Sequence, residues 1–226
     1  MAKLFLSGGG SGMQSELLDK AFADALDKTK PLLYIPIAID NKKYPYPGCL
    51  LWIKNTFDNL GVKEYVMWDE KDIYNYKKEK VTNFSGIYIG GGNTPYLLKT
   101  IKDNGFIDFI KEAMKKSLPI YGGSAGAIIF AKTIIPSLVE DENFVALTDL
   151  SAINAINNYE LWCHYGPKEE DSLQEFIKKY NLVNMVALPE ETGLVIDGTN
   201  MTVLGKKNAL LINGAVKKEI KSGEKI

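Results

Sequence analysis

The sequence predicts an α/β protein in which a mostly parallel sheet is flanked by helices and antiparallel edge strands lie near the C-terminus. Short apolar runs alternate with amphipathic segments along the first two-thirds of the 226 residues, as expected when strands and helices alternate. Two of these runs end in glycine clusters that open onto helical segments. In the last third, apolar runs are separated by short turns instead of helices. We expect one domain spanning residues 1–226.

The individual elements follow from the spacing of apolar residues. In the segment Ser15–Leu26, for example, Leu17, Leu18, Ala21 and Phe22 recur at helical intervals. The predicted strands are Lys3–Leu6, Leu32–Ile37, Glu64–Trp68, Gly86–Ile89, Pro119–Tyr121 and Leu161–Tyr165. The predicted helices are Ser15–Leu26, Leu50–Leu60, a helix opening at Pro95, Phe106–Lys116, Ala127–Ala131 and Ser172–Tyr180.

The last third contains four more short apolar runs. They are Met185–Leu188, Gly193–Ile196, Met201–Leu204 and Ala209–Ile212. Since the turns between them are rich in glycine, asparagine and aspartate, we expect an antiparallel meander at one edge of the sheet. The Lys/Glu-rich tail from Lys217 is expected to fray.

Composition and charge exclude several classes of function. The formal net charge is −1 and the pI is near 6.0, so the protein has no excess of positive charge that would attract nucleic acid or anionic membranes. The chain contains neither a recognisable signal peptide nor an apolar run long enough to span a membrane, which favours a cytoplasmic protein. Cys49 and Cys163 match no disulfide framework or zinc motif. One histidine and scattered acids form no metal-ligand set, and no cofactor is expected.

The segment Gly122-x-Ser124-x-Gly126 matches the nucleophile elbow, a tight turn that exposes a serine between a strand and a helix. A Cβ at either glycine is expected to collide with a neighbouring strand or helix. Ser124 then lies at a helix N-terminus, where backbone N–H groups can stabilise an oxyanion. The alternative is a strand–helix turn without chemistry.

A nucleophilic serine requires a base, and His164 is the only histidine in the chain. The neighbouring Cys163 is expected to point to the opposite side of the strand and to be a core residue. An acid that orients the histidine is expected between the serine and the histidine, in the loop containing Glu140, Asp141 and Glu142. The residues alone do not choose among these three acids.

A second glycine cluster, Gly90-Gly91-Gly92-Asn93-Thr94, also follows a strand and opens a helix. A glycine backbone can approach a ligand closely, so this loop can supply a second oxyanion donor. The competing interpretation is a phosphate cradle, but the loop lacks the lysine of a P-loop. The Ser7–Gly10 cluster is interpreted as a plain turn at a strand end.

The GGGNT cluster, followed by Gly123-Ser124-Ala125-Gly126-Ala127 and a His-Tyr pair, resembles the peptidase E (S51) family of serine peptidases. That family includes aspartyl dipeptidases and, more distantly, cyanophycinases. The resemblance extends from the SGGG after the first strand to the Leu188–Glu191 segment. It implies a fold like that of class I glutamine amidotransferases and a monomeric or dimeric protein.

The resemblance also implies roles for individual residues. Ser124 is the expected nucleophile, His164 the base, and Asp141 the acid that matches the family's triad. The expected oxyanion and substrate-binding residues are Gly91, Gly92, Asn93 and Ala125. One departure concerns specificity: family members that cleave aspartyl dipeptides are expected to use an arginine, and this chain has none.

Three hypotheses for function follow. The first is a serine exopeptidase or dipeptidase that cleaves short peptides through an acyl-enzyme. The second is an amide or ester hydrolase acting on a non-peptide metabolite. The third is a non-catalytic module that binds anions at the glycine loops.

Overall fold

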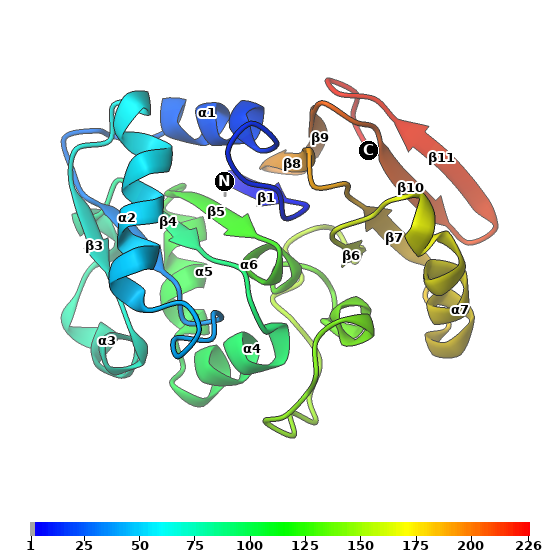
Figure 1. Cartoon of the computed structure of the whole chain (residues 1–226), viewed down its shortest axis with the longest axis horizontal. Coiled ribbons are helices and arrows are strands. Elements are labelled where there is room, and N and C mark those ends of the chain that lie inside the picture. Colours follow the sequence, from blue (N-terminus) through cyan, green and yellow to red (C-terminus); the bar gives the residue numbers. More distant parts are fainter. Residues whose placement is uncertain (1–2) are drawn as a thin grey trace.

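A computed structural model describes residues 3–226 and contains two sheets (Figure 1). The larger sheet has the strand order β3-β2-β4-β5-β1-β8-β9. The first five strands in that order are parallel to one another. The strand β8 pairs antiparallel with β1, and β9 pairs antiparallel with β8. Their bounds are β3 Tyr65–Met67, β2 Leu32–Ile35, β4 Gly86–Ile89, β5 Pro119–Gly123, β1 Lys3–Ser7, β8 Thr192–Asp197 and β9 Asn200–Gly205.

The α-helices are α1 Glu16–Asp24, α2 Tyr46–Phe57, α3 Glu70–Asn75, α4 Thr94–Asp103, α5 Ile107–Lys115, α6 Ala125–Ile128 and α7 Glu170–Tyr180. Short 3-10 turns are η1 Asp58–Leu60, η2 Tyr76–Lys78, η3 Val81–Asn83, η4 Ile135–Val139 and η5 Pro167–Glu169. These bounds confirm the predicted α/β class with a mostly parallel sheet and antiparallel strands near the C-terminus.

Alternating strand residues separate two cores on the faces of the large sheet. Apolar residues of α1 and α2, including Phe22 and Phe57, pack with the strand residues Tyr34, Tyr88 and Tyr121 on one face. The strand residues that alternate with them face α4, α5 and α6 on the other. Helices therefore cover both faces of the parallel sheet, as such sheets require.

The C-terminal strands differ from the predicted single meander. The strands β8 and β9 extend the large sheet, but β7 Asn184–Ala187, β10 Ala209–Asn213 and β11 Val216–Ile220 join β6 Glu160–Trp162 in a second sheet. This second sheet lies beside α7 on the right of Figure 1. The tail beyond Lys217 does not simply fray, because β11 is paired along its length with β10.

The carboxyl ends of β1, β4 and β5 lie side by side. The register pairs Ser7 with Gly123 and Ile89 with Gly122, so the three loops that follow these strands start at the same edge of the sheet. Ligands of open α/β sheets bind at this edge. The fold thus brings all three glycine clusters of the sequence to one place.

Candidate active site

Ser124 lies at the turn between β5 and α6 in a strained backbone conformation, with φ 49° and ψ −112°. Strain of this kind in a non-glycine residue is characteristic of functional turns. The flanking glycines make the turn possible. A Cβ on Gly122 would lie 2.3 Å from the Gly126 carbonyl oxygen, and one on Gly126 would lie 2.2 Å from that of Ile89. The predicted collisions with helix and strand are confirmed.

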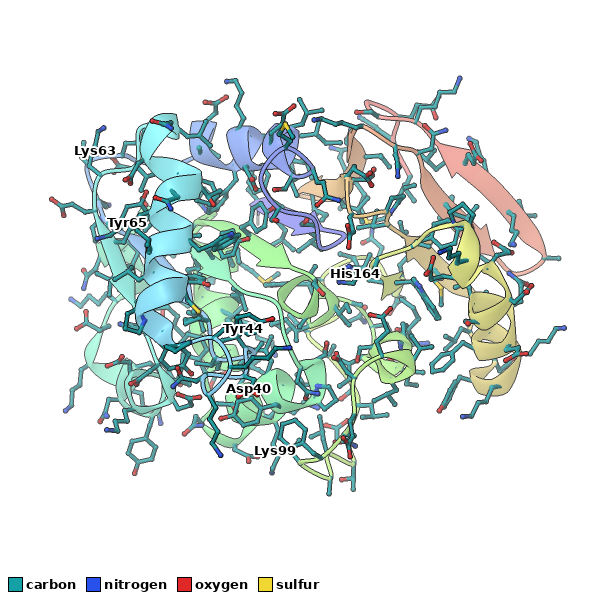
Figure 2. All side chains as sticks on the ribbon, viewed as in Figure 1. Asp40, Tyr44, Lys63, Tyr65, Lys99 and His164 are labelled. Atoms are coloured by element: carbon teal, nitrogen blue, oxygen red, sulfur yellow. The ribbon has the colours of Figure 1, made fainter. Side chains whose placement is uncertain are left out.

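The side chains of Ser124 and His164 are in contact, with 2.8 Å between Ser124 Oγ and His164 Nε2. His164 comes two residues after β6 ends, so it is not inside a strand as predicted. Its own φ is 56°, and its backbone N–H donates to the Gly8 carbonyl at 2.8 Å. The loop after β1 therefore fixes the position of the histidine next to the elbow (Figure 2).

The carboxylate in contact with His164 belongs to Glu190, whose Oε1 lies 3.1 Å from His164 Nδ1. Gln14 Nε2 donates to the other carboxylate oxygen at 2.8 Å. Both hydrogen bonds favour the ionised form, so they lower the pKa of Glu190. Since an ionised carboxylate can only accept, the proton of the imidazole lies on Nδ1, and Nε2 is free to accept from the Ser124 hydroxyl.

Asp141, expected at this position, is held elsewhere. Its Oδ2 accepts hydrogen bonds from the Thr94 backbone N–H at 3.0 Å and the Thr94 hydroxyl at 2.6 Å. The acidic loop is thereby attached to the first turn of α4. The carboxylate that the structure places against His164 thus belongs to Glu190, which follows the histidine in the chain, and not to Asp141.

Asn93 is also engaged in local structure. Its backbone N–H donates to the Ala38 carbonyl at 2.8 Å, and its side chain caps α4 by accepting from the Tyr96 N–H at 2.9 Å. Its Nδ2 donates to the Glu142 carbonyl at 2.9 Å. Because these groups are occupied, Asn93 shapes the loop and offers no free backbone donor to an oxyanion.

The other three expected donors are better placed. Within residues 3–226, no hydrogen-bond acceptor is assigned to the backbone N–H of Gly91, Gly92 or Ala125. A Cβ on Gly91 would lie 3.2 Å from Ser124 Cβ, so Gly91 closely approaches the elbow. By contrast, a Cβ on Gly92 would meet the Ala38 carbonyl oxygen at 2.1 Å. Gly91 therefore lies against Ser124, and Ala125 follows Ser124 directly in the chain.

The Ser7–Gly10 cluster is more than a turn. A Cβ on Gly9 would lie 2.1 Å from the His164 ring, so the imidazole packs directly on the Gly9 backbone. The Gly10 N–H donates to the Glu190 carbonyl at 3.1 Å. The cluster thus supports two of the residues that surround Ser124. The sequence analysis did not predict this role of the cluster. It also did not predict the contact of Glu190 with His164 or that of Gln14 with Glu190.

Neither cysteine is placed as a nucleophile. Cys163 is buried with its sulfur 3.7 Å from the Ser7 carbonyl oxygen, and burial raises the pKa of its thiol far above the usual range. Cys49 is a buried residue of α2, and burial raises its thiol pKa. Both remain thiols, and the prediction that Cys163 belongs to the core is confirmed.

A cavity of about 500 Å³ opens beside Ser124. Residues of the three glycine clusters form one side, and α2 with the loop before it forms the other. A smaller hollow of about 40 Å³, which includes Glu140 and Asp141 in its lining, lies next to His164 and Cys163. In residues 3–226 there is no group of three or more potential metal ligands, and none of the helices could cross a membrane.

A serine in contact with a histidine, itself in contact with a carboxylate, at the edge of a parallel sheet defines the class of α/β serine hydrolases. The model of peptidase family S51 matches residues 4–204. The chain belongs to this family and is a serine peptidase.

Several relatives carry the name peptidase E. The chain is 27% identical over 196 residues to peptidase E of Actinobacillus pleuropneumoniae serotype 3 (strain JL03), covering 79% of this chain and 80% of that protein. Peptidase E of Shewanella denitrificans is 27% identical over 192 residues, covering 82% and 79%.

Two crystal structures share the fold. A peptidase E protein of Listeria monocytogenes EGD-e aligns with a TM-score of 0.71 at 21% identity, covering 92% of this chain and 100% of that one. A peptidase from an acI-B1 actinobacterium aligns with a TM-score of 0.73 at 21% identity, covering 100% and 96%.

Proposed function

We propose that this chain is an exopeptidase for short peptides, dipeptides above all, and that Ser124, His164 and Glu190 are its catalytic triad. The observation that carries the proposal is the continuous contact from Ser124 Oγ through both nitrogens of His164 to Glu190. The peptidase E relatives support peptides as substrates. A cavity of about 500 Å³ suits one or two amino-acid residues better than a long chain.

The proposed reaction begins when Ser124 Oγ attacks the carbonyl carbon and its proton passes to His164 Nε2. Glu190 stabilises the imidazolium that forms and keeps its orientation. The backbone N–H groups of Gly91 and Ala125 donate hydrogen bonds to the developing oxyanion. The C–N bond then breaks as His164 protonates the leaving amine. Water attacks the acyl-enzyme with His164 again as base, releasing the second product and restoring Ser124.

Labelling with a fluorophosphonate, followed by intact-mass spectrometry, tests the activated serine. We expect a single adduct on the unmodified protein and none on Ser124→Ala or His164→Ala, both checked for folding by circular dichroism. Hydrolysis of a dipeptide panel should fall by several orders of magnitude in the same two variants, since triad members act together. Hydrolysis of simple esters or metabolite amides without hydrolysis of dipeptides would replace the proposal with the non-peptide alternative.

A further inference from the structure

The cavity beside Ser124 has walls of two kinds. On the side of the elbow, they are backbone of Gly90, Gly91 and Gly123. On the far side, they are side chains of α2, of the loop before it and of the sheet. Figure 2 shows Tyr44 in that loop, on the same side of the molecule as the foot of α2. A substrate whose carbonyl meets Ser124 can therefore place an adjacent side chain against this far wall.

The far wall is aromatic and pre-arranged. Tyr88 lies edge-on to Tyr34 and to Trp52, with ring centroids 5.6 Å and 5.8 Å apart. It also stacks on Tyr121 at 4.4 Å. Burial raises the pKa of Tyr34 and Tyr88, so both phenols are neutral. Another aromatic ring can join such a cluster in the edge-on geometry that aromatic side chains prefer.

The wall carries little charge. Among the described residues that line the cavity, Lys43 is the sole charged one, and it is exposed beside Tyr44, with its Nζ 5.2 Å from that ring's centroid. An acidic side chain bound deep in the cavity would lose its hydration without gaining a paired cation. The chain contains no arginine that could supply a planar, two-pronged partner.

The helix α2 leaves space for a guest. Gly48 and Trp52 are four residues apart, so they lie on the same face of the helix. Both residues line the cavity. A Cβ on Gly48 would meet nothing within 4 Å, so the missing side chain opens volume next to the indole. Trp52 itself is 38% exposed, and an apolar ligand in the cavity would cover part of this surface.

We propose that this cavity is the specificity pocket of the peptidase and that it selects a large apolar, above all aromatic, side chain flanking the scissile bond. The inference rests on the proposed function, whose substrate class it specifies. Trp52 and Tyr88 are the specificity-determining aromatic residues, and Gly48 provides the space. Small and acidic side chains are disfavoured.

The test compares hydrolysis of Phe-Gly and Gly-Phe with that of Ala-Gly, Gly-Ala and Asp-Gly, followed by mass spectrometry of the products. We expect at least one phenylalanine dipeptide to exceed its alanine counterpart by about tenfold or more in kcat/KM. The variants Gly48→Leu and Trp52→Ala should reduce this preference by about tenfold. Leu51→Ala is the matched control, because Leu51 is 60% exposed on the same helix and lies outside the cavity lining.

Binding to Ser124→Ala separates the pocket from the chemistry. Phe-Gly or Gly-Phe should raise the melting temperature of this variant more than the alanine dipeptides, and Gly48→Leu in the same background should abolish the difference. Binding without any hydrolysis by the unmodified protein would keep the pocket and overturn the proposed function. Equal binding of phenylalanine and alanine dipeptides, or a preference for Asp-Gly that Lys43→Gln removes, would overturn the pocket.

Discussion

Two carboxylates near Ser124 have different partners, and the difference predicts different consequences of neutralising them. Glu190 faces His164 Nδ1, so Glu190→Gln would present an amide to the ring and disturb the tautomer that Ser124 requires. We expect kcat to fall by about 10³–10⁴-fold, as for the loss of a triad carboxylate, with folding retained. The measurement is steady-state hydrolysis of the best dipeptide from the panel.

Asp141→Asn is the comparison for that experiment. It alters a carboxylate bound to Thr94, so its loss of kcat should be much smaller than that of Glu190→Gln. If Asp141→Asn abolished hydrolysis while Glu190→Gln left it intact, the triad as assigned here would be wrong, and Asp141 would recover the role that the family resemblance implies.

Only part of the site can be predicted from the sequence, and the reason differs from residue to residue. Ser124 and His164 can be found because the elbow has a local pattern and the chain contains a single histidine. Glu190 is held near His164 by a hydrogen bond from the Gly10 backbone N–H to the Glu190 carbonyl. This contact joins segments that are far apart in the sequence. The sequence signal that could have identified Glu190 is its position just after the apolar run that ends at Leu188. The expected chain order of serine, acid and histidine excludes this acid.

At the scale of elements, Asp141 connects the acidic loop after η4 to the N-terminus of α4. Replacing it with alanine removes the acceptor for the Thr94 N–H and hydroxyl, leaving two donors without their partner. We expect Asp141→Ala to lower the free energy of unfolding by about 1–3 kcal/mol. Urea denaturation followed by circular dichroism measures the change.

Glu142→Ala is the matched control, because Asn93 bonds to the backbone carbonyl of Glu142, which the substitution keeps. The midpoint of urea denaturation of this variant should stay close to that of the unmodified protein. Equal midpoints for all three proteins would show that the Thr94 contacts contribute nothing to stability.

The predicted and observed elements agree best where apolar periodicity is local. The helices α1 and α5 and the strand β4 lie within the predicted segments. The division of the C-terminal strands between two sheets was not predicted, because a short apolar run does not identify the strand with which it pairs. Pairing of β7 with β6, which is separated from it by α7, depends on tertiary packing that a single strand does not encode.

At the scale of the whole molecule, the buried carboxylate of Asp19 couples folding to pH. Asp19 on α1 is 4% exposed, facing the Ser15 hydroxyl at 2.7 Å and the buried aromatic cluster around Tyr121. Burial raises its pKa to about 6, since the charged form loses hydration. The unfolded chain should titrate near the ordinary value of about 3.9.

The direction of the effect follows from these two values. Below about pH 4, Asp19 is protonated in both states and its burial carries no charge penalty. As the pH rises toward 6, the unfolded state releases this proton more readily, so the free energy of unfolding declines and then levels off. A shift of about two pKa units corresponds to about 3 kcal/mol.

Asp19→Asn should remove this decline, because the amide stays neutral and keeps a similar shape. The difference in unfolding free energy between Asp19→Asn and the unmodified protein should therefore move in favour of the variant between pH 4 and pH 6, by up to about 3 kcal/mol. Urea titrations at several pH values give the difference directly. Asp24→Asn is the control, since the exposed Asp24 on the same helix pairs with Lys20 and has a lowered pKa. Its contribution changes only below about pH 4, so the difference for Asp24→Asn should stay flat between pH 4 and pH 6. A difference for Asp19→Asn that stays constant from pH 4 to pH 8 would mean that the carboxylate is hydrated in solution and that α1 packs less closely on the sheet than the structure shows.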